Sequence, residues 1–119
     1  MSNNIFLVQS EPVPGGEDEY NRWYTDQHIA EVLDLPGFVA AQRFRVADFQ
    51  RPGNPEPHYR YIAIYEIEGA PADALMALDA ALGSDILVSE AMDPGRMSHL
   101  FEPITERIEA GTTRHAATS

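Results

Sequence analysis

The sequence predicts a single α+β domain with the element order β-α-β-β-α-β. Four short stretches of apolar or alternating residues have the character of strands, and two longer stretches repeat apolar side chains at helical spacing. Proline and glycine residues separate these stretches. The order is that of the ferredoxin-like fold, in which two helices cover one face of a four-stranded antiparallel sheet.

The first strand is expected over residues 5–10, and the first helix begins at Glu17 after a loop rich in proline and glycine. Acidic residues in its first turn suit the positive end of the helix dipole. We expect the helix to end near Leu35, because Pro36 disfavours helical backbone in the residue before it and Gly37 permits a turn.

Proline and glycine residues also mark the ends of the later elements. The expected elements are a second strand at 38–47, a third strand at 58–67, a second helix at about 71–82 and a final strand at 96–104. Pro71 suits the first position of the second helix, and Gly83 suits its end. Segment 84–94 is ambiguous and allows a short helix. The domain should span residues 1–110, and the small polar tail 111–119 is expected to be disordered.

The third strand carries apolar side chains on both of its faces. Tyr61 and Tyr65 point to one face, whereas Ile62 and Ile64 point to the other. Two helices can cover only one face of the sheet, and a chain of 119 residues has nothing left to cover the second. We therefore expect two copies to pack sheet to sheet as a twofold homodimer.

Composition excludes several classes of function. The chain has no cysteine, so it has no disulfide and no thiol nucleophile. Its eight basic residues are all arginines against 19 acidic residues, which excludes lysine Schiff-base chemistry and disfavours nucleic-acid binding. No apolar run is long enough to span a membrane, and the N-terminus has no basic region of a signal peptide. A cytoplasmic location is the default expectation.

Large aromatic side chains and a histidine are concentrated in the first expected helix. Tyr20, Tyr24, His28 and Val32 follow one another at intervals of four residues, so they share one slowly drifting face. Such a face can pack in a core. Phenols and an imidazole can also bind a flat organic molecule and move its protons.

The stretch NRWYTDQHIAEVLDLPGFVAAQRFR resembles the signature of the EthD-like family of the dimeric α/β-barrel superfamily. Members show an aromatic pair, a histidine one turn later, Pro-Gly, and then a strand ending in arginines. The match is residue-specific over 20–45 and follows the element order over about 5–105. Ala30 stands where members often have proline, a departure that should not disturb the helix.

The resemblance implies a cavity between the first helix and the sheet in each subunit, with no obligatory metal or organic cofactor. Relatives act on cyclic or aromatic compounds as cyclases, decarboxylases, dehydratases, isomerases or cofactor-free oxygenases. Some dimeric barrels bind haem, but this sequence gives no clear sign of a haem site. A metal site is also not expected, because the histidines form no cluster in the sequence.

Three residues are predicted to be catalytic. His28 is the main candidate because imidazole titrates near neutral pH and is the commonest general acid or base. Tyr24 lies one turn earlier and can share a ligand with His28, or can be a core tyrosine with a satisfied hydroxyl. His99 lies in the final strand between apolar neighbours, where it either finds a buried partner or lines the cavity.

Six further residues are predicted to bind the substrate. They are Trp23, Tyr20, Arg43, Arg45, His58 and Tyr61. Trp23 would form a wall for a ring, and the two arginines on one strand face can hold a carboxylate or enolate or else pair with surface acids. Tyr20 is also a natural core residue, and His58 at a loop end is also a natural exposed residue.

Two classes of function remain. The first is a cofactor-independent lyase or isomerase acting on a cyclic or aromatic metabolite, in which His28 transfers a proton and Tyr24 or an arginine stabilises an oxyanion. The second is a non-catalytic protein that carries or senses a metabolite in the same cavity. The sequence does not identify the substrate.

Overall fold

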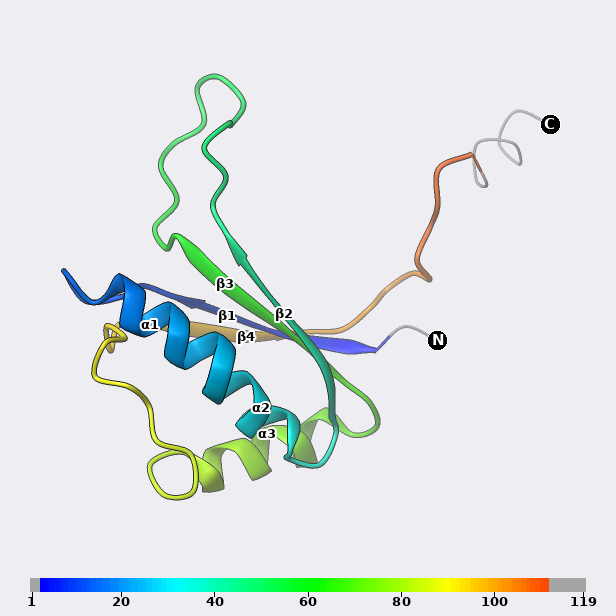
Figure 1. Cartoon of the computed structure of the whole chain (residues 1–119). Coiled ribbons are helices and arrows are strands. Elements are labelled where there is room, and N and C mark those ends of the chain that lie inside the picture. Colours follow the sequence, from blue (N-terminus) through cyan, green and yellow to red (C-terminus); the bar gives the residue numbers. More distant parts are fainter. Residues whose placement is uncertain (1–2, 112–119) are drawn as a thin grey trace.

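The computed structural model describes residues 3–111 and has one four-stranded antiparallel sheet in the order β2-β3-β1-β4 (Figure 1). The elements in chain order are β1 (Asn4–Ser10), α1 (Glu17–Trp23), η1 (Tyr24–His28), α2 (Ile29–Leu33), β2 (Phe38–Arg45), β3 (Tyr61–Ile67), α3 (Pro71–Ala81) and β4 (Met97–Phe101). The ferredoxin-like element order predicted from the sequence is confirmed.

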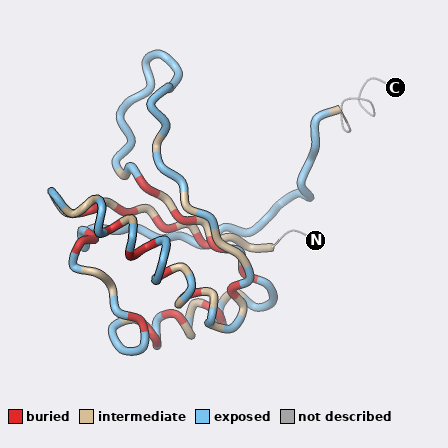
Figure 2. Tube along the Cα trace, in the orientation of Figure 1, coloured by how far each residue is buried: buried red, intermediate tan, exposed pale blue. Residues whose placement is uncertain are grey.

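The helices lie on one face of the sheet and leave the other uncovered (Figure 1). Buried residues are concentrated where the helices meet the central strands β1 and β3 (Figure 2). Phe6 and Val8 of β1 and Tyr65 of β3 point into this layer, and Leu78 of α3 closes it from the helix side. The core is therefore a single layer between helices and sheet.

The later strands are shorter than predicted, and β2 ends at Arg45 rather than at residue 47. β3 begins at Tyr61 rather than residue 58, because the backbone N–H of Arg60 donates to the Glu11 carboxylate. β4 is shorter than predicted and spans Met97–Phe101. Segment 84–94 contains no helix; it is an irregular loop.

The irregular loop before β4 is tied to the segment between β1 and α1. Val13 N–H donates to the Ala91 carbonyl at 2.8 Å, and Asp93 N–H donates to the Glu11 carbonyl at 2.8 Å. These bonds hold Met92, which is buried, over the edge of the core. The loop thus lies close to the first helix, where it contributes to the site described below.

The turn after the first helix has the predicted glycine. Gly37 has φ +91°, a backbone conformation that other residues adopt only with strain. A Cβ at this position would lie 3.0 Å from the Cβ of Ala74 on α3. The glycine therefore both permits the turn into β2 and allows α3 to pack closely against it.

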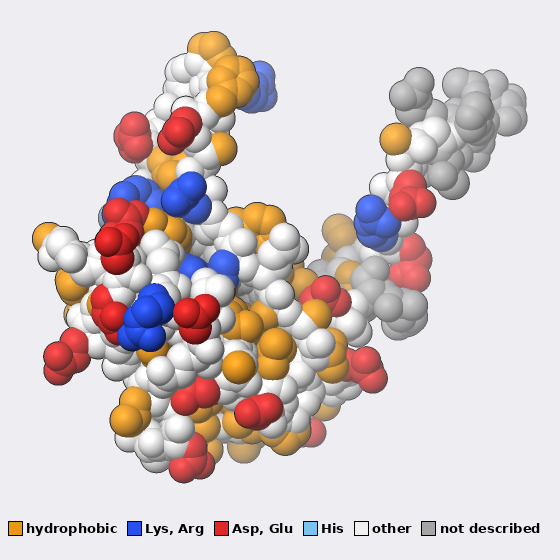
Figure 3. Space-filling model, viewed as in Figure 1, with side chains coloured by type: hydrophobic (Ala, Val, Ile, Leu, Met, Phe, Trp, Pro, Cys, Tyr) orange, Lys and Arg blue, Asp and Glu red, His pale blue; other side chains and the backbone are white. Residues whose placement is uncertain are grey.

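The uncovered face of the sheet is largely apolar. Phe44, Met97 and Phe101 on this face are 42%, 44% and 47% exposed, and Ile62 and Ile64 of β3 lie between them. Elsewhere, acidic side chains are scattered over the visible surface in Figure 3, in keeping with a net charge of −11.

Two segments project from the body of the domain. They are the loop between β2 and β3 and the chain after β4, as Figure 1 shows. The radius of gyration is 17.0 Å, whereas a compact chain of this length has a radius of gyration of about 13–14 Å. Among residues 3–111, no helix is both long and apolar enough to cross a bilayer.

Candidate functional site

The first helix is interrupted by a π turn, η1, that carries the two main candidate residues. Ile29 N–H donates to the carbonyl of Tyr24, five residues earlier, where an α-helix would use the residue four earlier. Tyr20, Tyr24 and His28 are all buried, as their spacing predicted. π turns are rare in proteins, and many of those that do occur lie at functional sites. The π turn that contains His28 therefore supports a functional role for this residue.

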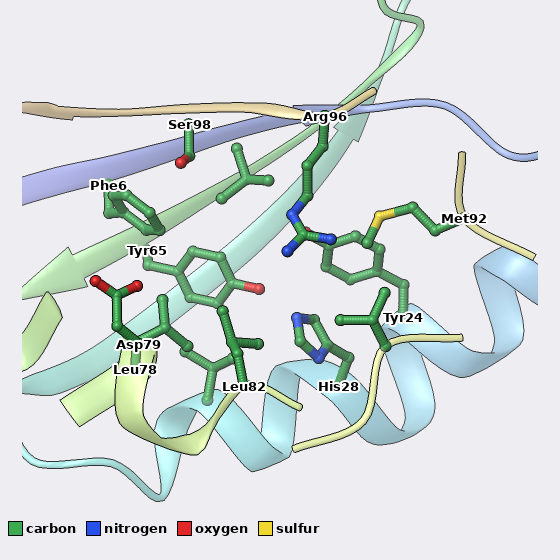
Figure 4. Close-up of a pocket in the computed structure, with 13 residues that line it drawn as sticks. Phe6, Tyr24, His28, Tyr65, Leu78, Asp79, Leu82, Met92, Arg96 and Ser98 are labelled. Atoms are coloured by element: carbon green, nitrogen blue, oxygen red, sulfur yellow. The ribbon is translucent and has the colours of Figure 1, made fainter. Parts of the chain in front are cut away.

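A cavity of about 160 Å³ lies between this helix, the sheet, α3 and the loop before β4 (Figure 4). Its lining consists of Phe6, Val8, Tyr24, His28, Val32, Tyr65, Leu78, Asp79, Leu82, Val88, Met92, Arg96 and Ser98. An engineered protein cavity of about 150 Å³ holds one benzene molecule. The space here therefore suits a ligand built on one ring.

His28 is 7% exposed, and its ring is held between two aromatic neighbours. The Trp23 ring stacks on it with centroids 4.6 Å apart, and the Tyr24 ring meets it edge-on at 5.1 Å. Its Nδ1 is buried without a hydrogen-bond partner. Burial lowers the pKa of His28 to about 4, and the positive charge of Arg96 acts in the same direction. The imidazole is therefore neutral at neutral pH and can accept a proton.

Two tyrosine hydroxyl groups face the same space. Burial raises the pKa of Tyr24 to about 12, although its interaction with the Tyr65 hydroxyl opposes the rise. Burial also raises the pKa of Tyr65. The Tyr65 hydroxyl interacts electrostatically with Tyr24 but makes no hydrogen bond of good geometry. Both phenols stay protonated and can donate to an oxygen that gains negative charge.

Arg96 supplies a positive charge to the cavity. It immediately precedes β4, and Figure 4 shows its guanidinium group directed toward His28 and Tyr24. Within residues 3–111, no carboxylate or other side chain forms an ion pair or hydrogen bond with it. Its five N–H donors are therefore available to a ligand.

Arg43 does not reach this cavity, because its guanidinium group is engaged elsewhere. Its Nη1 donates to Thr25 Oγ1 at 2.8 Å, and its Nη2 donates to Asn21 Oδ1 at 2.9 Å. Its Cζ lies 4.5 Å from the centroid of the Tyr24 ring, on a cation–π contact. Arg43 and Arg45 line a separate, shallow hollow on the other side of the first helix.

Three more predicted binding residues lie outside the cavity. Tyr20 is fully buried, and its hydroxyl is 2.6 Å from Ser10 Oγ. Tyr61 lines the shallow hollow, where its hydroxyl donates to the Glu17 carboxylate. Trp23 stacks behind His28 and does not form a cavity wall. These side chains hold the helix against the sheet.

Two other histidines, His58 and His99, are not brought together with His28. His99 pairs with Leu7 in the β4–β1 ladder and points to the uncovered face of the sheet, because successive residues of a strand alternate between faces. His58 is exposed in the loop between β2 and β3. In the described part of the chain, no cluster of three or more His, Cys, Asp or Glu is arranged to hold a metal ion.

Sequence reasoning missed Arg96 and Tyr65 as site residues. The signal for Arg96 was the alternation of the final strand, which puts Arg96 and Ser98 on the face opposite His99. Tyr65 shares its strand face with Tyr61, but only the position of the helix decides which of the two meets His28. Both omissions therefore concern tertiary placement.

Comparisons with known proteins support the fold. No family model matches the chain, and no curated protein sequence matches it. A solved structure, the heme-degrader MhuD from Mycobacterium tuberculosis with two hemes bound in its active site, superposes with a TM-score of 0.58 at 17% sequence identity. The superposition covers 87% of this chain and 98% of that one. The likeness identifies the shared fold.

Proposed function

We propose that this protein is a cofactor-independent lyase or isomerase that transfers a proton on a cyclic or aromatic small molecule. The observation that carries the proposal is His28, a neutral imidazole that lines a cavity suited to one ring. The resemblance of residues 20–45 to the EthD-like family supports the same chemistry, with cyclase, decarboxylase and dehydratase as its forms.

The residues can divide the reaction between them. His28 removes a proton from a carbon next to a carbonyl group, and the electron pair of the C–H bond moves onto the carbonyl oxygen. Tyr24 and Tyr65 donate hydrogen bonds to this developing oxyanion. Return of the proton from His28 to another carbon gives isomerisation, whereas departure of a group from the enolate gives elimination.

The proposal also includes a homodimer formed through the uncovered face of the sheet. Ile64 lies near the middle of this face. Its apolar neighbours are exposed, and an exposed apolar patch often marks a protein–protein interface. Ile64→Glu should convert the dimer into monomers, as measured by sedimentation equilibrium. Met76→Glu introduces the same charge on the exposed side of α3 and should leave the dimer intact.

Haem does not fit the cavity of this chain well. Pockets that bury drug-sized ligands measure about 300–1,000 Å³, and this cavity of about 160 Å³ lies below that range. Haem titration followed by the Soret band should therefore show no specific complex.

His28→Ala tests the catalytic role. In D₂O, the protein should accelerate exchange of the α-protons of a six-membered cyclic ketone or lactone, and the substitution should reduce this rate at least about 100-fold. His58→Ala is the matched control, because His58 is exposed and far from the cavity. A full exchange rate in His28→Ala contradicts the proposal. Ligand binding without exchange of any compound would favour a carrier.

A further inference from the structure

Arg96 differs from the arginines that are paired with acidic residues. Arg22 pairs with Glu19, Arg60 with Glu11, and Arg107 with Glu109. Within residues 3–111, Arg45 and Arg51 also lack an ion pair, but neither lines the cavity beside His28. Arg96 is thus the unpaired cation of this cavity, in a protein that has more than twice as many acidic as basic residues.

Asp79, the one carboxylate among the described residues that line the cavity, does not neutralise Arg96. Asp79 belongs to α3 and lies beside Phe6 and Leu78, at the opposite end from Arg96 in Figure 4. No ion pair joins the two side chains. The end of the cavity that contains His28 therefore has the charge of Arg96 nearby, while most of the remaining lining residues are apolar.

The two ends of the cavity differ in the polarity of their lining residues. Apolar side chains from the sheet, both helices and the loop form the walls around the body of the cavity; they are Phe6, Val8, Val32, Leu78, Leu82 and Val88. Arg96, His28 and Tyr65 contribute polar groups toward the other end, whereas Asp79 and Ser98 add polar groups beside Phe6. A ring with one anionic substituent complements this division.

We infer that the cavity binds the carboxylate anion of a single-ring acid, with the carboxylate on the Arg96 guanidinium group and the ring against the apolar walls. Guanidinium and carboxylate groups match in a planar, bidentate geometry. This inference deepens the proposed function and rests on it in one respect, that the cavity beside His28 is the substrate site. It specifies that the substrate is an acid.

Binding of neutral and anionic ring compounds tests the inference. The probes are benzoate and cyclohexanecarboxylate, each compared with its own amide by isothermal titration calorimetry at pH 7. The carboxylates should bind the wild-type protein at least about tenfold more tightly than the amides. Equal affinity, tighter binding of the amides, or no binding of any of the four compounds overturns the inference.

Arg96→Gln should remove the preference by weakening the carboxylates at least about tenfold and leaving the amides unchanged. Arg45→Gln is the matched control, because it removes the same charge from the shallow hollow and should retain the preference. A preference that persists in Arg96→Gln also overturns the inference. Thermal melting should show that Arg96→Gln stays folded, since the side chain is exposed and has no partner in residues 3–111.

The outcomes separate this inference from the proposed function, because binding is measured without turnover. A carboxylate preference that depends on Arg96, together with full exchange in His28→Ala, contradicts the proton-transfer role alone. Loss of exchange in His28→Ala without a carboxylate preference contradicts the anion site alone.

Discussion

Two arginines act on Tyr24, and they differ in whether their own N–H donors have side-chain partners among residues 3–111. The Arg43 guanidinium group stacks on the Tyr24 ring and donates to Thr25 and Asn21. Arg96 also acts on Tyr24 through its charge, yet no side chain in residues 3–111 bonds to it. Arg43 therefore stabilises the fold, because its donors are satisfied. Arg96 has donors that a ligand can use.

The tyrosines repeat this contrast. The Tyr20 hydroxyl bonds to Ser10 in the core, whereas the Tyr65 hydroxyl is buried in the cavity without a good hydrogen bond. Buried polar groups in folded proteins are nearly always paired. Among residues 3–111, four buried side-chain atoms lack a hydrogen-bond partner, and those of His28 and Tyr65 belong to residues that line the cavity, whereas those of Trp23 and Glu31 do not.

The largest expected effect is a loss of folding stability at acid pH, caused by protonation of the buried His28. Its pKa is about 4 in the folded protein and near 6.5 in the unfolded chain, so below pH 6.5 the unfolded chain binds the proton more readily. Stability contributed by the neutral imidazole is complete above pH 6.5 and is lost as the pH falls toward 4. The loss should reach about 3 kcal/mol and then level off.

Urea unfolding at several pH values measures this effect as a difference between variants. The carboxylates of the chain also titrate in acid, so wild type is compared with His28→Gln, in which the contribution of the imidazole is absent. The two free energies of unfolding should converge as the pH falls from 6.5 to 4. The difference between wild type and His58→Gln should stay constant, and a similar convergence there would show that burial of His28 is not its cause.

The next effect separates the two arginines directly. Arg43→Met should lower the free energy of unfolding by about 2–3 kcal/mol, because two hydrogen bonds and a cation–π contact are lost. Arg96→Met should change it by less than about 0.5 kcal/mol. Chemical denaturation of both variants measures this contrast. Equal losses would break the distinction between a scaffold arginine and a site arginine.

The smallest effect separates the two tyrosines. Tyr20→Phe leaves Ser10 unpaired in the core and should cost about 1–2 kcal/mol of stability. Tyr65→Phe removes a hydroxyl that interacts with Tyr24 but lacks a hydrogen bond of good geometry, so stability should be unchanged or raised by up to about 1 kcal/mol. Thermal unfolding compares the pair. A clear loss of stability in Tyr65→Phe would mean that its hydroxyl already has a structural partner.

The sequence by itself determined the order of elements and much of the helix that carries the site. Periodicity identified the strands, Pro36 and Gly37 marked the end of the first helix, and a spacing of four residues put Tyr24 and His28 on its buried face. These features depend on local geometry, because the positions of side chains along a helix or strand follow from its repeat. The sheet order that results was therefore predictable.

Only the tertiary structure decided which side chains meet. The register of β4 on β1 turned His99 away from His28 and brought Ser98 to the cavity face, with Arg96 just before the strand. Because of the way the first helix packs on β3, Tyr65 lines the cavity, whereas the Tyr61 hydroxyl donates a hydrogen bond to Glu17. Whether a polar group is paired depends on neighbours distant in sequence, and for that reason composition and spacing could not distinguish Arg43 from Arg96.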